Sequence, residues 1–234
     1  MSRLLALLFL GLLGLFPATV QAGLELAAGS TDEISFGDVA GFDATGSSLT
    51  FMFWYRHVGS ANLTEDVAML GKGGTGFYFY HASPASPNGI ATGVAAAWEC
   101  RVSTGNQLPA NTWTHVAFTW NGTLWQIYVN GAVATTAGTC TTNRSDQGAT
   151  NLAFVDNTAA NSIIAAFKAW SVALSAAEVA AEAQVIRPQR TENLLMWNPL
   201  DDALRALDYS GQGQHGTLTG TVQRDSPPAS WGGE

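Results

Sequence analysis

Charge is scarce in this sequence. Only 12% of its 234 residues are Asp, Glu, Lys or Arg, the formal net charge is −8, and Lys72 and Lys168 are the only lysines. Nucleic acids and anionic membrane surfaces are bound through clusters of basic side chains, and the sequence contains no such cluster. The composition therefore argues against nucleic acid as a partner.

Long apolar segments are also missing, apart from the first 22 residues. There Arg3 precedes the apolar run Leu4–Phe16. Ala22 then offers a small residue for cleavage before Gly23. This pattern predicts a secretory signal peptide over 1–22, and its apolar run is too short to span a membrane. We expect a mature chain without a membrane span that is secreted or located at the cell surface or in the periplasm; an uncleaved anchor is the alternative.

Cysteine occurs only twice, as Cys100 and Cys140. In an exported protein an even number of cysteines indicates a disulfide. A bond between them would close a loop of about 40 residues, and the chain-entropy model gives it roughly 4 kcal/mol of stabilisation. Two buried free thiols are the alternative.

Recognisable catalytic motifs are absent. The sequence has no Gly-x-Ser-x-Gly nucleophile elbow and no nucleotide-binding loop. Glycoside hydrolases use two carboxylates that act together, whereas the adjacent pairs Glu65-Asp66 and Asp201-Asp202 would point to opposite faces of a strand. The four histidines are too dispersed for a local zinc site; they are His57, His81, His115 and His215. We therefore expect no catalytic residues and a protein that is not an enzyme.

Strand signals dominate what the sequence does contain. Runs of β-branched and aromatic residues alternate with clusters of Gly, Pro, Asn and Ser, which predicts an all-β protein. The predicted strands are 24–27, 33–36, 49–58, 67–70, 77–80, 94–102, 114–120, 124–129, 133–136, 152–155, 163–170 and 194–200. The run 49–58 is apolar on both faces, as expected of a central strand. The Pro-containing stretch 82–93 is expected to be an exposed loop.

The clearest signal lies in residues 113–134. Asn-Gly pairs at 121–122 and 130–131 separate three strand-like runs, and Asn-Gly favours the type I′ turn of a two-residue hairpin. With such a turn at 121–122, Phe118 faces Trp125. One face of this meander is then apolar and the other mixed, which indicates a sheet that packs on a second sheet.

One helix is predicted after Leu174. Ser175 suits the N-cap, and Glu178 three residues later completes a capping box. Alanine and glutamate continue the helix to about Val185, and Pro188 prevents further extension.

Three segments in this order resemble the laminin-G-like/pentraxin-like group of concanavalin-A-type jelly rolls. They read SLTFMFWYRHV (48–58), WTHVAFTWNGTLWQIYVNG (113–131) and FKAWSVALSAAEV (167–179). The resemblance implies an all-β, concanavalin-A-like jelly-roll sandwich of two antiparallel sheets, with one short helix near 175–185. We expect a single such domain over residues 23–222.

The C-terminal segment 191–222 also looks like material of this family. It contains Trp-x-x-Leu-Asp at 197–201 and Asp-x-Ser-Gly-x-Gly-x-His-Gly-Thr at 208–217, a pattern that often begins such domains. We expect this segment to complete a sheet, with the stub of a second domain as the alternative. Residues 223–234, rich in Pro and Gly, are expected to form a disordered tail.

Members of this family bind glycans or proteins, which makes the mixed face of the meander a candidate site. Aromatic rings stack on sugar faces, and the predicted register places His115 beside Tyr128. The candidate ligand contacts are Trp98, Trp113, His115, Gln126 and Tyr128. Burial of the rings and a structural hydrogen bond for His115 are the alternatives. The tryptophans expected in the core are Trp54, Trp120, Trp125 and Trp170.

Calcium is the cofactor that the resemblance implies, bound by loop oxygens. The turn after Val155 corresponds to one that carries acidic and amide ligands in pentraxin-like relatives. Asp156 and Asn157 match, but Thr-Ala-Ala at 158–160 replaces the further acids. Asp208 is a weaker candidate, because an aspartate at such a turn also suits an Asx turn.

These features predict a secreted, non-catalytic binding or adhesion module for a glycan, a glycoprotein or a surface protein. The alternative is a structural subunit of a surface appendage or a virion decoration, in which the chain forms oligomers with copies of itself.

Overall fold

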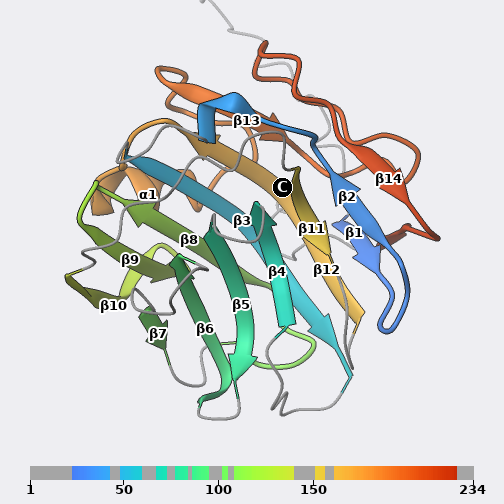
Figure 1. Cartoon of the computed structure of the whole chain (residues 1–234), viewed down its shortest axis with the longest axis horizontal. Coiled ribbons are helices and arrows are strands. Elements are labelled where there is room, and N and C mark those ends of the chain that lie inside the picture. The colour runs from blue at the N-terminus through green and yellow to red at the C-terminus, as the bar shows by residue number, and fades with distance from the viewer. Residues whose placement is uncertain are drawn as a thin grey trace, which may run out of the picture.

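The computed structural model describes residues 23–42, 48–59, 67–72, 77–83, 86–94, 102–104, 108–139, 151–155 and 161–225. The predicted signal peptide and the predicted Cys100–Cys140 disulfide lie outside these ranges. Within them the chain forms two antiparallel sheets that pack face to face (Figure 1), as the sequence predicts. No helix of the described residues is long and apolar enough to cross a membrane.

The larger sheet contains eight of the described strands. Seven follow one another in the order β10 (Ala132–Thr139), β9 (Leu124–Val129), β8 (Thr114–Trp120), β3 (Leu49–Val58), β12 (Asn161–Trp170), β1 (Gly23–Leu26) and β15 (Gln223–Asp225), and β13 (Leu194–Asn198) also pairs with β12. Strand β3 lies between β8 and β12 and is buried along most of its length. The prediction of a central strand there is confirmed.

The smaller sheet contains seven of the described strands. Their order is β14 (Thr217–Thr219), β2 (Glu33–Ser35), β11 (Leu152–Val155), β4 (Val67–Lys72), β5 (Phe77–Ser83), β6 (Ser86–Val94) and β7 (Val102–Thr104). A single 3₁₀ turn, η1 (Ala40–Phe42), follows β2.

The loop predicted over 82–93 is wrong, because most of this stretch belongs to β5 and β6. The two strands are paired from Phe77↔Val94 to Ser83↔Ser86, with an irregularity between His81 and Ser83. That irregularity falls opposite the Pro-Asn-Gly sequence of β6. A β-bulge accommodates such residues without ending the strand.

Phenylalanine rings from both sheets fill the space between them. Phe154 of the smaller sheet contacts Phe53 and Phe167 of the larger sheet edge to face, with ring centroids 5.1 Å apart in both pairs. Trp120 and Trp125 are fully buried in the same core, with ring centroids 5.2 Å apart. The predicted apolar face of the meander is therefore the core face.

The β8–β9 hairpin has a longer turn than the Asn-Gly signal predicts. Trp120 is opposite Trp125, and Phe118 is opposite Ile127 rather than Trp125. Residues 121–124 therefore separate the last opposed pair, and the register differs from the predicted one by two positions. Because a shift of two preserves the alternation of side chains, every residue keeps its predicted face.

A side-chain cap explains this difference. The amide oxygen of Asn121 accepts the backbone N–H groups of Thr123 and Leu124, at 3.0 and 2.8 Å. Asn121 does not adopt the positive φ of a type I′ turn. The second Asn-Gly pair does, since φ is +50° at Asn130 and +78° at Gly131, and the predicted two-residue turn is confirmed there.

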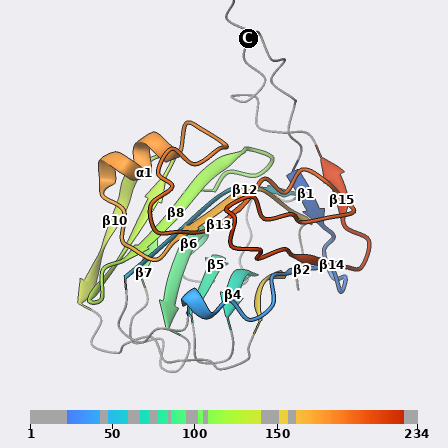
Figure 2. The same cartoon turned by 90° about the horizontal axis from the view of Figure 1, so that it is seen from above.

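A second apolar layer covers the outer face of the larger sheet. Helix α1 (Ala176–Glu182) begins with the predicted capping box of Ser175 and Glu178 and ends three residues before Val185. Figure 2 shows α1 against β8 and β10, on the side of the sandwich away from β4 and β5. The residues packed in this layer are Met52, Ala117, Tyr128, Trp170, Leu174, Val179 and Leu194.

The C-terminal segment contributes strands to both sheets. β14 pairs with β2 and β15 pairs with β1, so the last described strands lie beside the first ones (Figure 1). The carboxylate of Asp32 joins the two segments by accepting the N–H groups of Ala27 and Thr221, at 2.9 and 2.7 Å. Burial opposes ionisation of Asp32, but these hydrogen bonds prevail and lower its pKa. Residues 223–225, expected in a disordered tail, instead form β15.

The Asn130-Gly131 turn provides a test of how helix α1 contacts the meander. A Cβ at Gly131 would lie 3.2 Å from Ala180 Cα, whereas a Cβ at Gly213, with a similar φ of +74°, would meet nothing within 4 Å. Both Gly→Ala changes strain the backbone by about 1 kcal/mol. We expect Gly131→Ala to cost roughly 1 kcal/mol more than Gly213→Ala, because it also overpacks the helix contact. Urea unfolding of the two variants measures the difference, and equal losses would contradict the contact.

Candidate functional site

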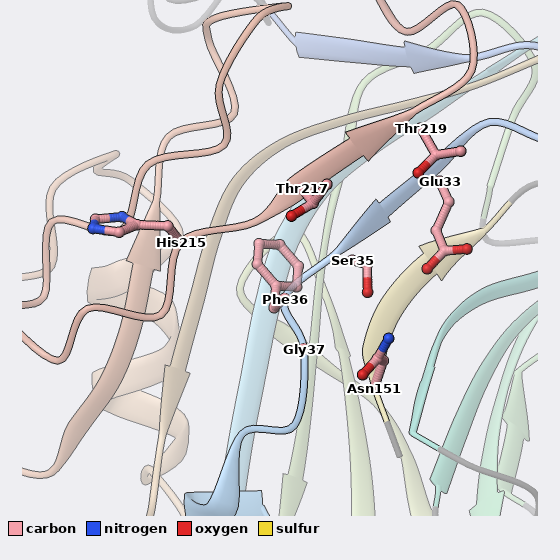
Figure 3. A pocket seen from close by; sticks show the side chains of 8 residues that line it. All are labelled: Glu33, Ser35, Phe36, Gly37, Asn151, His215, Thr217 and Thr219. Carbon is pink, nitrogen blue, oxygen red and sulfur yellow. The ribbon is translucent and has the colours of Figure 1, made fainter. Parts of the chain in front are cut away.

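A pocket of about 410 Å³ lies on the outer face of the smaller sheet, where β14 pairs with β2. Figure 3 shows the side chains that line it. Three segments far apart in the sequence supply them: β2 and the residues after it, the residue before β11, and the segment that ends in β14. The lining residues are Glu33, Ser35, Phe36, Gly37, Asn151, His215, Thr217 and Thr219.

Strand alternation presents the polar side chains of this pocket. Ile34 is fully buried in the core, so its neighbours Glu33 and Ser35 point to the outer face. The register places Thr217 opposite Ser35 and Thr219 opposite Glu33. Opposed residues have Cβ atoms about 5 Å apart, so the four polar side chains form two short rows.

Small residues make the surface concave. Ala153 is opposite Ser35 on β11, and Gly37 has a φ of +70° with empty space where a Cβ would point. The ring of Phe36 lies beneath, only 4% exposed and stacked on Phe167. The pocket therefore has an aromatic base and polar walls.

Most polar side chains that line this pocket have no partner among the described residues. Among the described residues, the side chains of Glu33, Asn151, Thr217 and Thr219 make no hydrogen bond or ion pair, and the buried Oγ of Ser35 has no partner either. In Figure 3 the carboxylate of Glu33, the hydroxyl of Ser35 and the amide of Asn151 converge. Asn151, Thr217 and Thr219 are exposed and Glu33 and Ser35 are half-buried, so water reaches most of these groups and a ligand rich in hydrogen-bonding groups can take its place.

Glu33 is the only carboxylate among the described residues that line the pocket. His215, on its edge, accepts the N–H of Asp208 through Nδ1 at 3.0 Å. Its ring points away from the other labelled side chains in Figure 3. The side chains that converge in the pocket therefore include one anionic group and no cationic one.

A laminin G-like model of the concanavalin A-like lectin/glucanases superfamily matches residues 28–180, more than half of the chain. The chain belongs to this superfamily. The jelly-roll fold predicted from the sequence is confirmed. No curated protein sequence is significantly similar to this one.

Solved structures share this fold at low sequence identity. A "putative carbohydrate binding protein from Bacteroides ovatus" superposes with a TM-score of 0.62 and 16% identity over 89% of this chain and 61% of its own. The binding domain of Paraclostridial Mosquitocidal Protein 1 superposes with a TM-score of 0.53 and 13% identity, over 70% of this chain and 51% of its own. A receptor binding domain superposes with a TM-score of 0.50 and 17% identity, over 60% of this chain and 36% of its own. The chain thus spans less than two thirds of each of these proteins, and such identities show a common fold alone.

Two of the predicted ligand contacts of this jelly roll are buried. His115 is 1% exposed and Tyr128 2% exposed, because α1 and its flanking residues cover the outer face of the larger sheet. The observed register places Tyr128 opposite Ala117 rather than His115. Neither ring is open to a ligand in this conformation.

The other predicted contacts are not gathered into a site. Trp113 is half-buried, and the guanidinium of Arg56 lies 5.1 Å from its ring centroid. Gln126 is half-buried and accepts the hydroxyl hydrogen of Tyr128 at 2.6 Å. Trp98 lies outside the described residues. A ligand role for these side chains remains a prediction.

Asp208 does not suit calcium. One carboxylate oxygen accepts the N–H groups of Trp197 and Ser210, and the other accepts Ser210 Oγ–H and the N–H of Gln214, all within 3.0 Å. Four donors occupy the lone pairs that a cation would need. Asp156 and Asn157 lie outside the described residues, which contain no group of three His, Cys, Asp or Glu side chains able to hold a metal.

The sequence did not identify the pocket residues as a site, although their alternation of polar and apolar residues is visible in it. Glu33-Ile34-Ser35 and Thr217-Leu218-Thr219 both alternate polar and apolar residues, which places the polar ones on an outer face. Nothing local indicates that these two strands pair. The second also lies beyond residue 180, outside the matched family region.

A buried ion pair fixes the helix that covers His115 and Tyr128. The ammonium of Lys168 donates to the carboxylate and the carbonyl oxygen of Glu182, both at 2.8 Å, and to the carbonyl of Val185 at 2.9 Å. The second carboxylate oxygen of Glu182 accepts the N–H groups of Gln189 and Arg190, both at 2.8 Å. Burial lowers the pKa of Lys168, and the charge of Glu182 opposes that shift.

Removing one charge of the Lys168–Glu182 pair is expected to lower the free energy of unfolding far more than removing both charges. Glu182→Gln leaves a buried ammonium without an anion and should lower the free energy of unfolding by about 3–5 kcal/mol. The double variant Lys168→Met/Glu182→Gln should recover part of this loss. Glu192→Gln, at a side chain 81% exposed, is the control and should change little. Urea unfolding measures all three, and a loss below about 1 kcal/mol for Glu182→Gln would contradict a buried pair.

The buried ring of His115 has lost its hydrogen bonds to water, and no protein hydrogen bond among the described residues replaces them. Both of its ring nitrogens lack hydrogen-bond partners among the described residues, and its ring lies edge-on to Trp54. Burial lowers the pKa of His115 to about 3, and the nearby charge of Lys168 contributes. The folded protein therefore holds a neutral imidazole at pH values where the unfolded chain takes up a proton.

His115→Leu should make the protein less sensitive to acid. Since the folded pKa of about 3 lies below the unfolded value near 6.5, His115 costs stability as the pH falls through this window, by about 1.4 kcal/mol per pH unit. We expect the variant to be at least as stable as the parent at neutral pH. Its advantage should grow towards pH 3. Denaturant unfolding at several pH values checks this, and parallel stability curves would show that His115 is solvated.

Proposed function

We propose that this jelly roll is a secreted, non-catalytic module that binds a glycan, with the pocket between β2 and β14 as its site. One observation carries the proposal: unpartnered side chains of Glu33, Ser35, Asn151, Thr217 and Thr219 line a concave surface above an aromatic ring. Sugars present many hydroxyl groups, each both donor and acceptor, and short polar side chains on rigid strands match them. The named functions of the carbohydrate-binding and receptor-binding structures support the proposal of a binding module.

The pocket offers little for hydrolysis of a glycosidic bond. Glycosidases place two carboxyl groups on either side of the bond, one as acid and one as base or nucleophile. Glu33 is the one carboxylate among the described residues that line this pocket. Binding without hydrolysis is therefore the function that this site supports best.

Calcium remains a prediction for the turn that contains Asp156 and Asn157. Val155, the residue before that turn, is opposite Glu33 in the sheet. A cation at the turn would thus belong to the same end of the smaller sheet as the pocket. Repeating the binding measurement with EDTA tests this part of the proposal separately.

Binding is tested with an array of immobilised neutral oligosaccharides, followed by calorimetry with the strongest neutral oligosaccharide. We expect a weak complex, because a shallow site gives few fully buried contacts. Asn151→Ala and Thr217→Val should each lower the affinity by about fivefold, the loss expected for one hydrogen bond. Thr123→Val is the matched control at the exposed tip of the β8–β9 hairpin and should bind as the parent does.

Three outcomes would contradict the proposal. Unchanged affinity in both pocket variants would move the site elsewhere on the molecule. Release of reducing sugar from the bound oligosaccharide would make the protein an enzyme. An empty array together with regular oligomers in light scattering would favour the structural subunit.

A further inference from the structure

We infer that the pocket selects sugars that carry a free amino group, through the carboxylate of Glu33. This inference rests on the proposed glycan binding and adds the class of sugar. The Glu33 carboxylate carries a negative charge that has no cationic partner among the described residues.

Several other carboxylates of the described residues have cationic partners, and those of Asp32 and Asp208 accept backbone and side-chain hydrogen bonds instead. Asp225 pairs with Arg56 at 2.5 Å, Asp38 with Lys72 at 2.6 Å, and Glu182 with Lys168 at 2.8 Å. Glu33 is also half-buried, yet it has no ion pair and no hydrogen bond among the described residues. In a protein with a net charge of −8, a lone carboxylate inside a pocket attracts cations and repels anions.

The neighbours of Glu33 suit an ammonium group. Thr219 is opposite Glu33 on β14, and the Glu33 side chain extends from there towards Ser35 in Figure 3. The amide of Asn151 faces the carboxylate across the pocket (Figure 3). An ammonium has three hydrogens to donate and no lone pair. The carboxylate oxygens of Glu33 and the nearby hydroxyl oxygen of Ser35 can accept them, whereas the amide of Asn151 turns its nitrogen towards Glu33 in Figure 3. N-acetylation would remove the charge and two of the donors.

The same geometry disfavours acidic sugars. A uronate or sialate in the pocket would place a second carboxylate near Glu33, and the described residues that line the pocket include no Lys or Arg to offset it. Two like charges close together in a partly desolvated site repel each other. The pocket should therefore rank amino sugars above neutral sugars and neutral sugars above acidic ones.

The test compares two oligosaccharides with the same backbone. Calorimetry at about pH 6, at which amines are protonated, measures the binding of the glucosamine tetrasaccharide and of its fully N-acetylated counterpart. For the parent we expect the amine form to bind at least about fivefold more tightly, the effect of one close charge pair at a surface. Glu33→Gln should abolish this preference, so that the amine and acetylated forms bind with similar affinity.

Matched variants separate a specific contact from general attraction to an acidic protein. Glu192→Gln removes one exposed charge away from the pocket and should keep the preference. Melting curves of all variants verify that each is folded. A preference that persists in Glu33→Gln would overturn the inference, because the net charge would then cause it.

Other outcomes separate this inference from the proposed function. Equal affinity of the parent for both tetrasaccharides overturns the amine contact but leaves glycan binding in place. No binding of either, together with an empty array, removes both. A Ca²⁺-induced rise in melting temperature that Glu33→Gln abolishes would assign the carboxylate to a metal and overturn the amine contact.

Discussion

The buried ammonium of Lys168 determines which faces of this sandwich are open. A charge in the interior needs acceptors on all its hydrogens, and the end of α1 together with the next turn provides them. The helix must therefore lie on the outer face of the larger sheet. That position covers His115 and Tyr128. The smaller sheet is left with the outer face on which a pocket is formed.

Lys168 reaches the helix only because β12 is interrupted. The pairing with β3 changes register between Ala165 and Lys168, and Ala166 has a φ of +50°. Ile164 and Phe167 both face the core, three positions apart instead of two. Without this bulge, strict alternation from Ile164 would direct Lys168 into the apolar core. One irregular residue thus decides on which side of the sheet a charge is placed.

Local patterns predicted most of this fold. The capping box of α1 and the central position of β3 depend on neighbouring residues, and both are visible in the sequence. The turn at Asn121 was misjudged because its side chain caps the backbone instead of allowing a positive φ. The pocket was missed because it depends on the pairing of Ser35 with Thr217. That pairing depends on tertiary packing, and no short pattern encodes it.

The pairing of the first strands with the last has a consequence for the order in which the molecule is made. A chain emerging from the ribosome presents β2 early, but β14 and β15 only after nearly every other described strand. Until that final segment is made, one edge of β1 and one edge of β2 have no partner strand. Unpaired strand edges can associate with other chains. Contacts between residues so distant in the chain also form slowly. The pocket between β2 and β14 is therefore among the last parts to form, and a fragment that ends after β13 would contain the core phenylalanines but lack the β14 side of the pocket.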